Sequence, residues 1–496
     1  MKNLIYMMFG TICFSAICLF AQAAEGNAPA TLTVGAASEE ITPETPVMMG
    51  GYASRSKPHE GVRSPIFTRV LYCAKGAEQI LWTESDLIGF EAEDAAKIRQ
   101  TLSDATNVPA ERVIVSTTHT HSAPAAAPIC SPKESDYLEN FLIPRMVIAA
   151  KKAIQTAEDC TMTVVEGESH LAHDRRNDPA PGDGAAPNAD KAKAVVDYRV
   201  PAVGFQKADG SFKAVLIQYA MHPTSWSDQL IGAEWPGETA IAIRETFGDN
   251  VEPFVVQGAA GNLSSPSRKA PPEEMRRWGR ELVATVAEKL QTAKPLETAP
   301  FAAASSAFFC DYDRFDAETI RAKAEEYRKQ FAGRPDIIEF TINPWEKNTL
   351  DALENGTMQN QEIFVQAVLF GDHIFVTTPF ETFSHLNNLL AERCGFPVHV
   401  VGYTNGVYNY FPTKEAFEQG GYEPNSYLWY RSFPMKPGAL EKLAEDLAPI
   451  LSKLKIRVPS GAKVKIENLL FRQKNLDIAR SGNVPFHPFV APAPLG

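Results

Sequence analysis

Two histidines, His119 and His121, follow an apolar run that predicts a strand at residues 112–116. Because successive side chains of a strand alternate between its faces, residues two apart can project the same way. Such a pair at the end of a strand is typical of a metal site. The same two side chains could also do no more than hydrogen-bond neighbouring loops, so the motif alone leaves both interpretations open.

Two further candidate ligands also follow predicted strands. His222 comes after the strand predicted at residues 213–220, and Glu381 comes after two strands predicted within residues 366–377. Since the chain has no Cys-x-x-Cys pair, a zinc site would need imidazole, carboxylate and perhaps phenolate ligands, with one position open for catalysis. The candidate set is therefore His119 or His121, with His222 and Glu381.

Each of these residues also has a structural interpretation. His222 could be a hydrogen-bonded core histidine, and Glu381 could be a capping carboxylate at the start of a helix predicted at residues 382–393. Glu381 and His385 lie four residues apart, a spacing that could place two ligands on one helix face. We rank that pair below the strand-end set, because the same face contains leucines that could belong to the core.

A glycine-rich turn, residues 258–261, follows the strand predicted at 252–257 and leads to Ser264 and Ser265. Backbone N–H groups of such a turn could face an anion, and a serine near a metal could act as nucleophile or proton relay. The turn lacks the lysine of a P-loop and the Gly-x-Ser-x-Gly of a hydrolase elbow. Ser264 could equally be a helix N-cap.

The elements around these residues predict an α/β fold. A helix at residues 91–105 stands between predicted strands, and amphipathic helices are predicted at 273–292 and 440–454. We therefore expect mixed β-sheets with flanking helices in a single large catalytic domain. The active site is expected at the C-terminal ends of the strands, where open sheets have their ligand crevice.

Composition restricts the class of protein. The chain has 496 residues, of which 44% are hydrophobic and 22% charged, and its net charge is −12. These values predict a globular protein rather than a disordered one. The acidic balance, without a basic stripe, argues against nucleic acid or an anionic membrane surface as a partner.

The first 23 residues predict a cleavable secretory signal peptide. A short basic start is followed by an apolar run from Leu4 to Phe20 and by Ala21-Gln22-Ala23, which is typical of a cleavage site. A membrane anchor is the alternative, but small residues stand where an anchor would have basic ones. The mature protein is expected to be secreted or periplasmic, without a stable membrane anchor, and its five remaining cysteines argue against a disulfide scaffold.

Several of these motifs occur in one order that resembles the catalytic domain of neutral, non-lysosomal ceramidases. The resemblance spans most of the chain, and its blocks are Ile41-Thr42-Pro43, Met49-Gly50-Gly51-Tyr52, His119-Thr120-His121-Ser122-Ala123-Pro124, Ala220-Met221-His222-Pro223-Thr224, Ala233-Glu234-Trp235-Pro236-Gly237, Pro379-Phe380-Glu381, Asn405 to Tyr410 and Tyr422-Glu423. Ala123 stands where the family has glycine.

The resemblance implies roles for individual residues. Its zinc would be held by His119, His222, Glu381 and Tyr410. His121 would lie beside the metal, Arg175 would contact the substrate, and Tyr422 would be a second active-site tyrosine. The family's Gly-Asp-Val-Ser-Pro block is one residue longer here, from Gly261 to Pro266, so either Ser264 or Ser265 corresponds to its serine; counting from the glycine favours Ser264.

The resemblance also implies an activity, the zinc-dependent hydrolysis of ceramide to sphingosine and fatty acid. The expected domain spans residues 24–455, and residues 456–496 form a short C-terminal extension without room for the family's immunoglobulin-like domain. Ceramide specificity is therefore less well supported than hydrolysis. The alternatives are a metal-dependent amidase or esterase for a sugar or soluble substrate, and an inactive secreted protein that binds lipid or carbohydrate.

Overall fold

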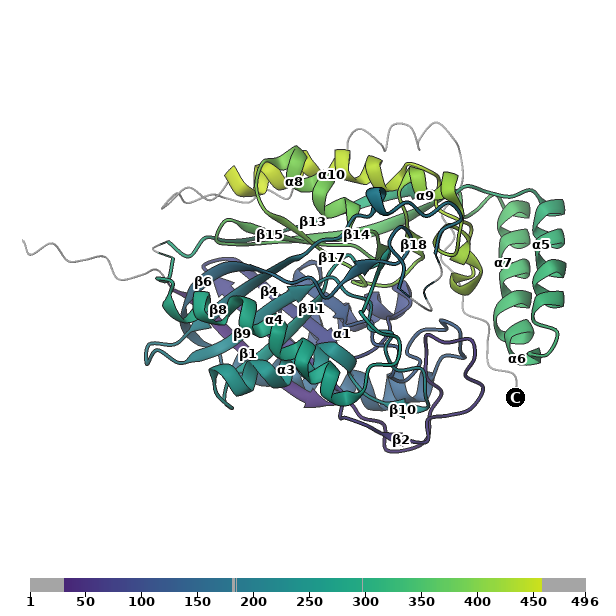
Figure 1. The fold of residues 1–496 in the computed structure, drawn as a ribbon. Coiled ribbons are helices and arrows are strands. Elements are labelled where there is room, and N and C mark those ends of the chain that lie inside the picture. The colour runs from purple at the N-terminus through teal and green to yellow at the C-terminus, as the bar shows by residue number, and fades with distance from the viewer. Residues whose placement is uncertain (1–30, 181–182, 184, 297, 457–496) are drawn as a thin grey trace, which may run out of the picture.

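The computed structural model describes residues 31–180, 183, 185–296 and 298–456 (Figure 1). The predicted signal peptide and the predicted extension after residue 456 lie outside these residues. The larger of the two main sheets has eight strands, in the order β11 (Glu252–Gln257), β9 (Phe212–Tyr219), β8 (Arg199–Gln206), β6 (Glu158–Glu168), β1 (Leu32–Glu40), β3 (Phe67–Lys75), β4 (Glu78–Ser85) and β5 (Val113–Thr117). Only its two outermost pairs, β11 with β9 and β4 with β5, are parallel.

A four-stranded sheet packs against the first. Its order is β13 (Phe301–Asp311), β14 (Asn360–Phe370), β15 (His373–Thr377) and β17 (Val398–Val401). Both sheets are mixed, as predicted, and three short pairs supplement them: β2 (Gly61–Val62) with β10 (Leu230–Ile231), β7 (His173–Asp174) with β12 (Leu263–Ser264), and β16 (Glu381–Thr382) with β18 (Tyr410–Phe411).

Helices cover the outer face of each sheet, so the domain has four layers (Figure 1). The eight-stranded sheet is covered by α1 (Ala92–Thr106), α2 (Ile143–Gln155), α3 (Glu234–Phe247) and α4 (Pro272–Thr292). The four-stranded sheet is covered by α8 (His385–Cys394) and α10 (Ala439–Ile456). At one end project α5 (Ala317–Gln330), α6 (Pro335–Ile337) and α7 (Asn343–Glu354), and α9 (Lys414–Gln419) lies near the short strands.

Strand alternation divides the apolar side chains between the inner and outer faces. Along β9, Val215 and Ile217 face α3 and α4, whereas Ala214 and Leu216 face the second sheet. Between the sheets, the Trp82 ring packs edge-on against Phe254 at 5.6 Å and Phe375 at 6.4 Å, measured between ring centroids. These aromatic contacts join the two sheets.

The edges of the eight-stranded sheet are brought together near the end of β17. Thr404 forms a bridge to Ser116 of β5, and Val401 forms a bridge to Gly258 just after β11. Gln257 at the end of β11 also donates a hydrogen bond to the Thr118 carbonyl at 3.2 Å. The segments that follow β5, β9, β11 and β15 therefore meet at one place.

The predicted position of Glu381 at a helix start is wrong. Glu381 belongs to β16, which pairs in parallel with β18, and α8 begins only at His385. The Glu381 N–H donates to the Asn409 carbonyl, and the Phe383 N–H donates to the Phe411 carbonyl. These backbone N–H groups would be left without partners in the first turn of a helix, and the segment before β18 and β18 itself satisfy them here. Glu381 and His385 consequently do not share a helix face.

Candidate metal centre

Four buried side chains converge where the strand ends meet. The Nε2 atom of His119 lies 3.1 Å from Nε2 of His222 and 3.3 Å from Nε2 of His121. Oε2 of Glu381 lies 3.4 Å from Nε2 of His119 and 3.6 Å from Nε2 of His222. Residues from three separate segments thus present ligand-type atoms to one small space.

The backbone at His119 creates this convergence. Strand β5 ends at Thr117, and His119 has a φ of 61°, in the left-handed region that few residues other than glycine adopt. The two imidazoles therefore meet because the chain bends sharply after the strand, and not because of strand alternation, which was the sequence argument. Glu234, Tyr403 and Asn405 nearby also have positive φ, at 51°, 53° and 61°. Backbone strain of this kind gathers at functional sites.

Hydrogen bonds fix the orientation of two of the imidazoles. Nδ1 of His119 lies 2.6 Å from the Ile88 carbonyl, and Nδ1 of His222 lies 3.2 Å from the Ala260 carbonyl. A carbonyl only accepts, so each Nδ1 must hold a proton, and a ring with no second proton presents an unprotonated Nε2. Two such lone pairs face each other across 3.1 Å. A cation between them would remove that repulsion.

Glu381 supplies a negative charge to the same space. Its Oε1 accepts a hydrogen bond from the Tyr430 hydroxyl. Its Oε2 is buried and has no hydrogen-bond partner among the described residues. Burial alone would raise the pKa of Glu381, but the neighbouring His119 and the nearby hydroxyls of Tyr410 and Tyr430 lower it below the usual value. The carboxylate is therefore ionised and has a free oxygen.

The donor set fits a divalent metal. Tetrahedral sites with bonds of about 2.0 to 2.1 Å have ligand atoms about 3.3 Å apart, and the four separations here run from 3.1 to 3.6 Å. Burial lowers the pKa of both His121 and His222, which keeps these imidazoles neutral and able to ligate. His119, His222 and Glu381, whose three ligand atoms are all mutually close, could together hold such an ion, and Nε2 of His121 lies 3.3 Å from that of His119.

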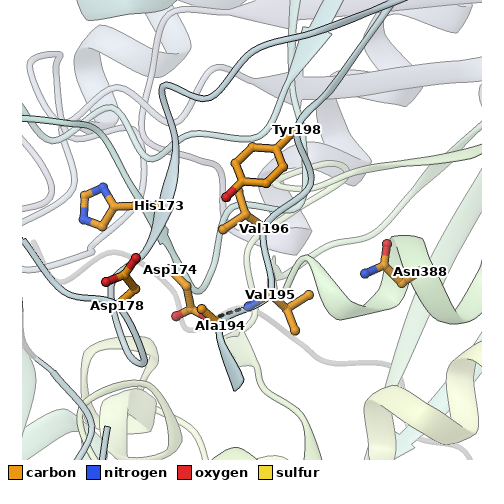
Figure 2. Close-up of a pocket in the computed structure, with 8 residues that line it drawn as sticks. All are labelled: His173, Asp174, Asp178, Ala194, Val195, Val196, Tyr198 and Asn388. Carbon is orange, nitrogen blue, oxygen red and sulfur yellow. Dashed lines mark hydrogen bonds between the residues drawn. The ribbon is translucent and has the colours of Figure 1, made fainter. Parts of the chain in front are cut away.

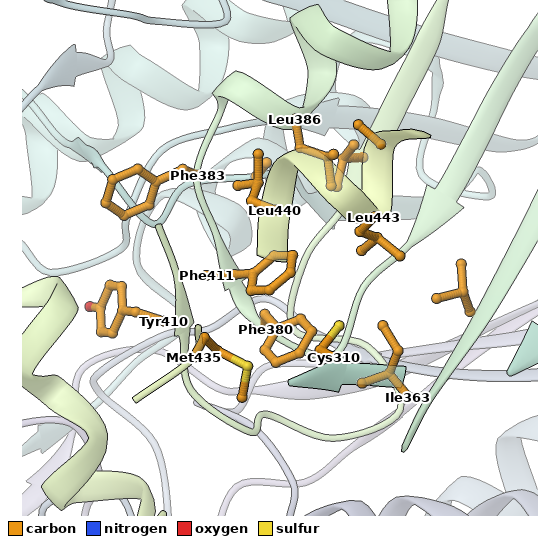
Figure 3. Close-up of a cluster of buried hydrophobic side chains, with 14 of the residues drawn as sticks. Cys310, Ile363, Phe380, Phe383, Leu386, Tyr410, Phe411, Met435, Leu440 and Leu443 are labelled. Atoms are coloured by element: carbon orange, nitrogen blue, oxygen red, sulfur yellow. The ribbon is translucent and has the colours of Figure 1, made fainter. Parts of the chain in front are cut away.

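Tyr410 lies beside Glu381 because β18 pairs in register with β16. Behind them the rings of Phe380 and Phe411 stack with centroids 4.3 Å apart and an angle of 8°, within the buried cluster shown in Figure 3. The stacked pair fixes the two short strands and hence both polar side chains. The Tyr410 hydroxyl accepts a hydrogen bond from Nη2 of Arg175 at 3.0 Å.

Arg175 is buried and fully engaged. Its Nε donates to Oε1 of Glu423 at 2.9 Å, and its Nη2 donates to the Gly261 carbonyl at 2.7 Å as well as to Tyr410. Arg176 holds the other oxygen of Glu423. Arg175 is thus a positive charge held beside Tyr410 by its Nε and Nη2 contacts.

The two candidate serines point to different partners. The Ser264 hydroxyl donates to Oδ1 of Asp183 at 3.1 Å, whereas the Ser265 hydroxyl pairs with that of Ser225 at 2.9 Å. In the described part of the chain neither hydroxyl is hydrogen-bonded to a histidine. No histidine in the described part of the chain is therefore in place to act as a general base for either serine.

Tyr422 lies at the rim of the site. It is 47% exposed, and its ring contacts that of Tyr410 with centroids 5.6 Å apart. A separate pocket lies next to the segment that leads into Arg175, and Figure 2 shows its lining of His173, Asp174, Asp178, Ala194, Val195, Val196, Tyr198 and Asn388. None of the predicted site residues lines that pocket.

Sequence reasoning missed two tyrosines that support the centre. The Tyr403 ring stacks on His119 with centroids 3.9 Å apart and an angle of 21°, and Tyr430 donates to Glu381. Both belong to the segment that is dense in tyrosine, residues 403–430. That density was a usable signal, but nothing in it indicates which tyrosine meets which ligand.

Solved structures match this fold. Neutral ceramidase from Pseudomonas aeruginosa superimposes with a TM-score of 0.64 at 17% identity, over 89% of this chain and 77% of that one. The chain has the neutral ceramidase fold. A ceramidase complexed with C2 matches with a TM-score of 0.63 at 16% identity, over 89% of this chain and 78% of the other. No family model matches the sequence, and no curated protein does either.

In the described part of the chain no helix has both the length and the apolar character needed to cross a bilayer.

Proposed function

We propose that this protein is a zinc-dependent amidohydrolase of the neutral ceramidase family, which cleaves the amide bond of an N-acylated lipid such as ceramide. The observation on which this rests is the convergence of three buried imidazoles and one carboxylate, in which Nε2 of His119, Nε2 of His222 and Oε2 of Glu381 lie within 3.1 to 3.6 Å of one another. The ceramidase fold supports the choice of substrate class, because both matched structures are ceramidases.

Zinc held by His119, His222 and Glu381 would polarise the scissile carbonyl and make a hydroxide available near neutral pH. Tyr410 is the fourth ligand that the family resemblance implies, and Nε2 of His121 is the fourth atom that the distances favour. Metal content separates these assignments. Loss of the ion in Tyr410→Phe but not in His121→Ala supports tyrosine ligation, and the reverse result supports His121.

The remaining residues bind the substrate and move protons. In the Tyr410 assignment, His121 is a neutral base beside the reacting group, since burial lowers its pKa and its Nδ1 has no partner among the described residues. The exposed Tyr422 is placed to contact the polar end of a substrate at the rim. Arg175 acts through its fixed charge on Tyr410, and Ser264 and Ser265 act as positioning residues.

Release of fatty acid from a short-chain fluorescent ceramide tests the proposal. We expect hydrolysis that is abolished by chelation and restored by added zinc. If the metal centre is intact and the protein hydrolyses soluble N-acyl amides or esters but not ceramide, the substrate is not ceramide. A folded wild-type chain that binds no zinc at all would contradict the enzyme assignment.

The site of action is proposed to be outside the cytoplasm. This rests on the signal-peptide pattern in residues 1–23. N-terminal sequencing of protein recovered from the periplasm or medium should begin at Ala24. Recovery of chains that begin at Met1 in the cytoplasm would contradict secretion.

A further inference from the structure

A second group of metal-ligand side chains lies between the two sheets, away from the centre described above. Glu166 belongs to β6 of the eight-stranded sheet, whereas His373 and His399 belong to β15 and β17 of the four-stranded sheet. In the β15–β17 register His399 lies opposite Phe375, two residues from His373, so both histidines are on the same face. The three residues therefore meet across the gap between the sheets.

The ligand-type atoms of this group are close together. Nδ1 of His373 lies 2.8 Å from Nε2 of His399, which in turn lies 3.8 Å from Oε2 of Glu166. The three atoms lie within 4.8 Å of one another. Tetrahedral ligand atoms are about 3.3 Å apart at zinc, and the separations of 2.8 and 3.8 Å lie on either side of that value.

One interpretation needs no metal, and it leaves an atom unexplained. Oδ1 of Asp372 lies 3.5 Å from Nε2 of His373, which favours a proton on that nitrogen and a lone pair on Nδ1. His399 could then donate to His373 in a simple hydrogen bond. That arrangement leaves Oε2 of Glu166 buried without a hydrogen-bond partner among the described residues.

The nearby cations do not satisfy Glu166 either. Arg199 pairs with both oxygens of Asp197, at 2.7 and 2.9 Å. Lys289 donates to the backbone carbonyl of Glu166 at 2.6 Å rather than to its carboxylate. An unpaired carboxylate oxygen is costly to bury, and a bound cation would satisfy it together with both imidazoles.

We propose that Glu166, His373 and His399 form a second, structural metal site, which binds a borderline divalent ion such as zinc and joins the two sheets. Two imidazoles and one carboxylate suit zinc rather than calcium or magnesium, which prefer oxygen ligands alone. The site needs no substrate access, because its role is to link β6 with β15 and β17. It does not depend on the proposed enzymatic function.

The test counts zinc ions per folded chain by mass spectrometry of the full-length protein purified in zinc-buffered medium. We expect two ions in the wild type and one each in Glu166→Gln and His399→Ala. The matched controls are Glu362→Gln, an exposed glutamate on β14, and His170→Ala, an exposed histidine, and both should keep two. If His399→Ala does not fold, Glu166→Gln decides, because Glu166 is only partly buried.

Further variants separate this site from the proposed active site. His222→Ala should keep one ion, and the double variant His222→Ala with Glu166→Gln should keep none. One ion in the wild type and none in His222→Ala would overturn the second site and leave the proposed function intact. One ion that His222→Ala keeps and Glu166→Gln loses would support the second site and contradict the proposed function. Unchanged metal content in folded Glu166→Gln would also overturn the second metal site.

Discussion

The Tyr430 hydroxyl donates a hydrogen bond to Oε1 of Glu381, which leaves Oε2 as the oxygen that faces His119 and His222. Groups that orient a metal ligand in this way change metal affinity by about 10- to 100-fold when they are removed. Tyr430→Phe should therefore weaken zinc binding by about that factor, as measured in competition with a chelator. Tyr327→Phe, which removes a hydroxyl contact to Tyr427, is the control. Equal affinity in both variants would contradict an orienting role for Tyr430.

Glu423 compensates the charges of Arg175 and Arg176 in the buried wall of the site. Removing one member of a buried ionic group leaves uncompensated charge, which typically costs about 3 to 5 kcal/mol. Glu423→Gln should lower the free energy of unfolding by about 3 kcal/mol in denaturant titrations. Glu415→Gln, which breaks the exposed pair with Lys193, should change it by less than about 1 kcal/mol. Similar losses in the two variants would be inconsistent with the buried network.

Among the described residues the hydroxyls at positions 264 and 265 have no histidine partner: Ser264 donates to Asp183 and Ser265 pairs with Ser225. We expect Ser264→Ala and Ser265→Ala each to retain hydrolysis within about tenfold of wild type, because each removes one hydrogen bond and no nucleophile. Steady-state rates with saturating zinc measure this. A loss of about a thousandfold in one variant only would identify that serine as a direct participant.

Glu84 is a buried carboxyl on β4, and its pH dependence can be measured. Burial and the neighbouring Asp86 raise its pKa well above the usual glutamate value of 4.5, although a hydrogen bond from Ser116 opposes the shift. The native state therefore holds a proton that the unfolded state loses near pH 4.5, so the contribution of Glu84 to stability is full below that pH and falls as pH rises.

Replacement by glutamine removes this titration. The stability of Glu84→Gln relative to wild type should thus increase from pH 4 to pH 8, as measured by urea unfolding at each pH. Glu93→Gln, which changes an exposed glutamate of α1, should show no such trend. A constant difference between Glu84→Gln and wild type across that range would contradict a raised pKa.

Periodicity was sufficient to predict most of the fold. The buried face of α4, with Met275, Trp278 and Leu282, follows directly from helical spacing. The β16–β18 pair was not predicted, because its two strands are short and their pairing depends on the tertiary contact between Phe380 and Phe411. That pairing decides where Glu381 points, and local sequence has no information about it.

The site was predicted in part. The residue types at strand ends indicated His119, His222 and Glu381, and the structure brings them together. The position of His121 beside them depends on the left-handed backbone at His119, which a run of β-prone residues does not predict. The ion pair between Arg175 and Glu423 was not predicted, because the two residues lie 248 positions apart in the chain, beyond any local pattern.

The central claim is that the converging imidazoles and carboxylate form a catalytic zinc centre, and His222→Ala tests it most directly. Zinc content and release of fatty acid from short-chain ceramide are measured on the same folded preparations, with the exposed His170→Ala as the control. We predict that His222→Ala loses one zinc ion per chain and all hydrolysis, whereas His170→Ala keeps both. Wild-type zinc content or wild-type hydrolysis in folded His222→Ala would contradict the claim.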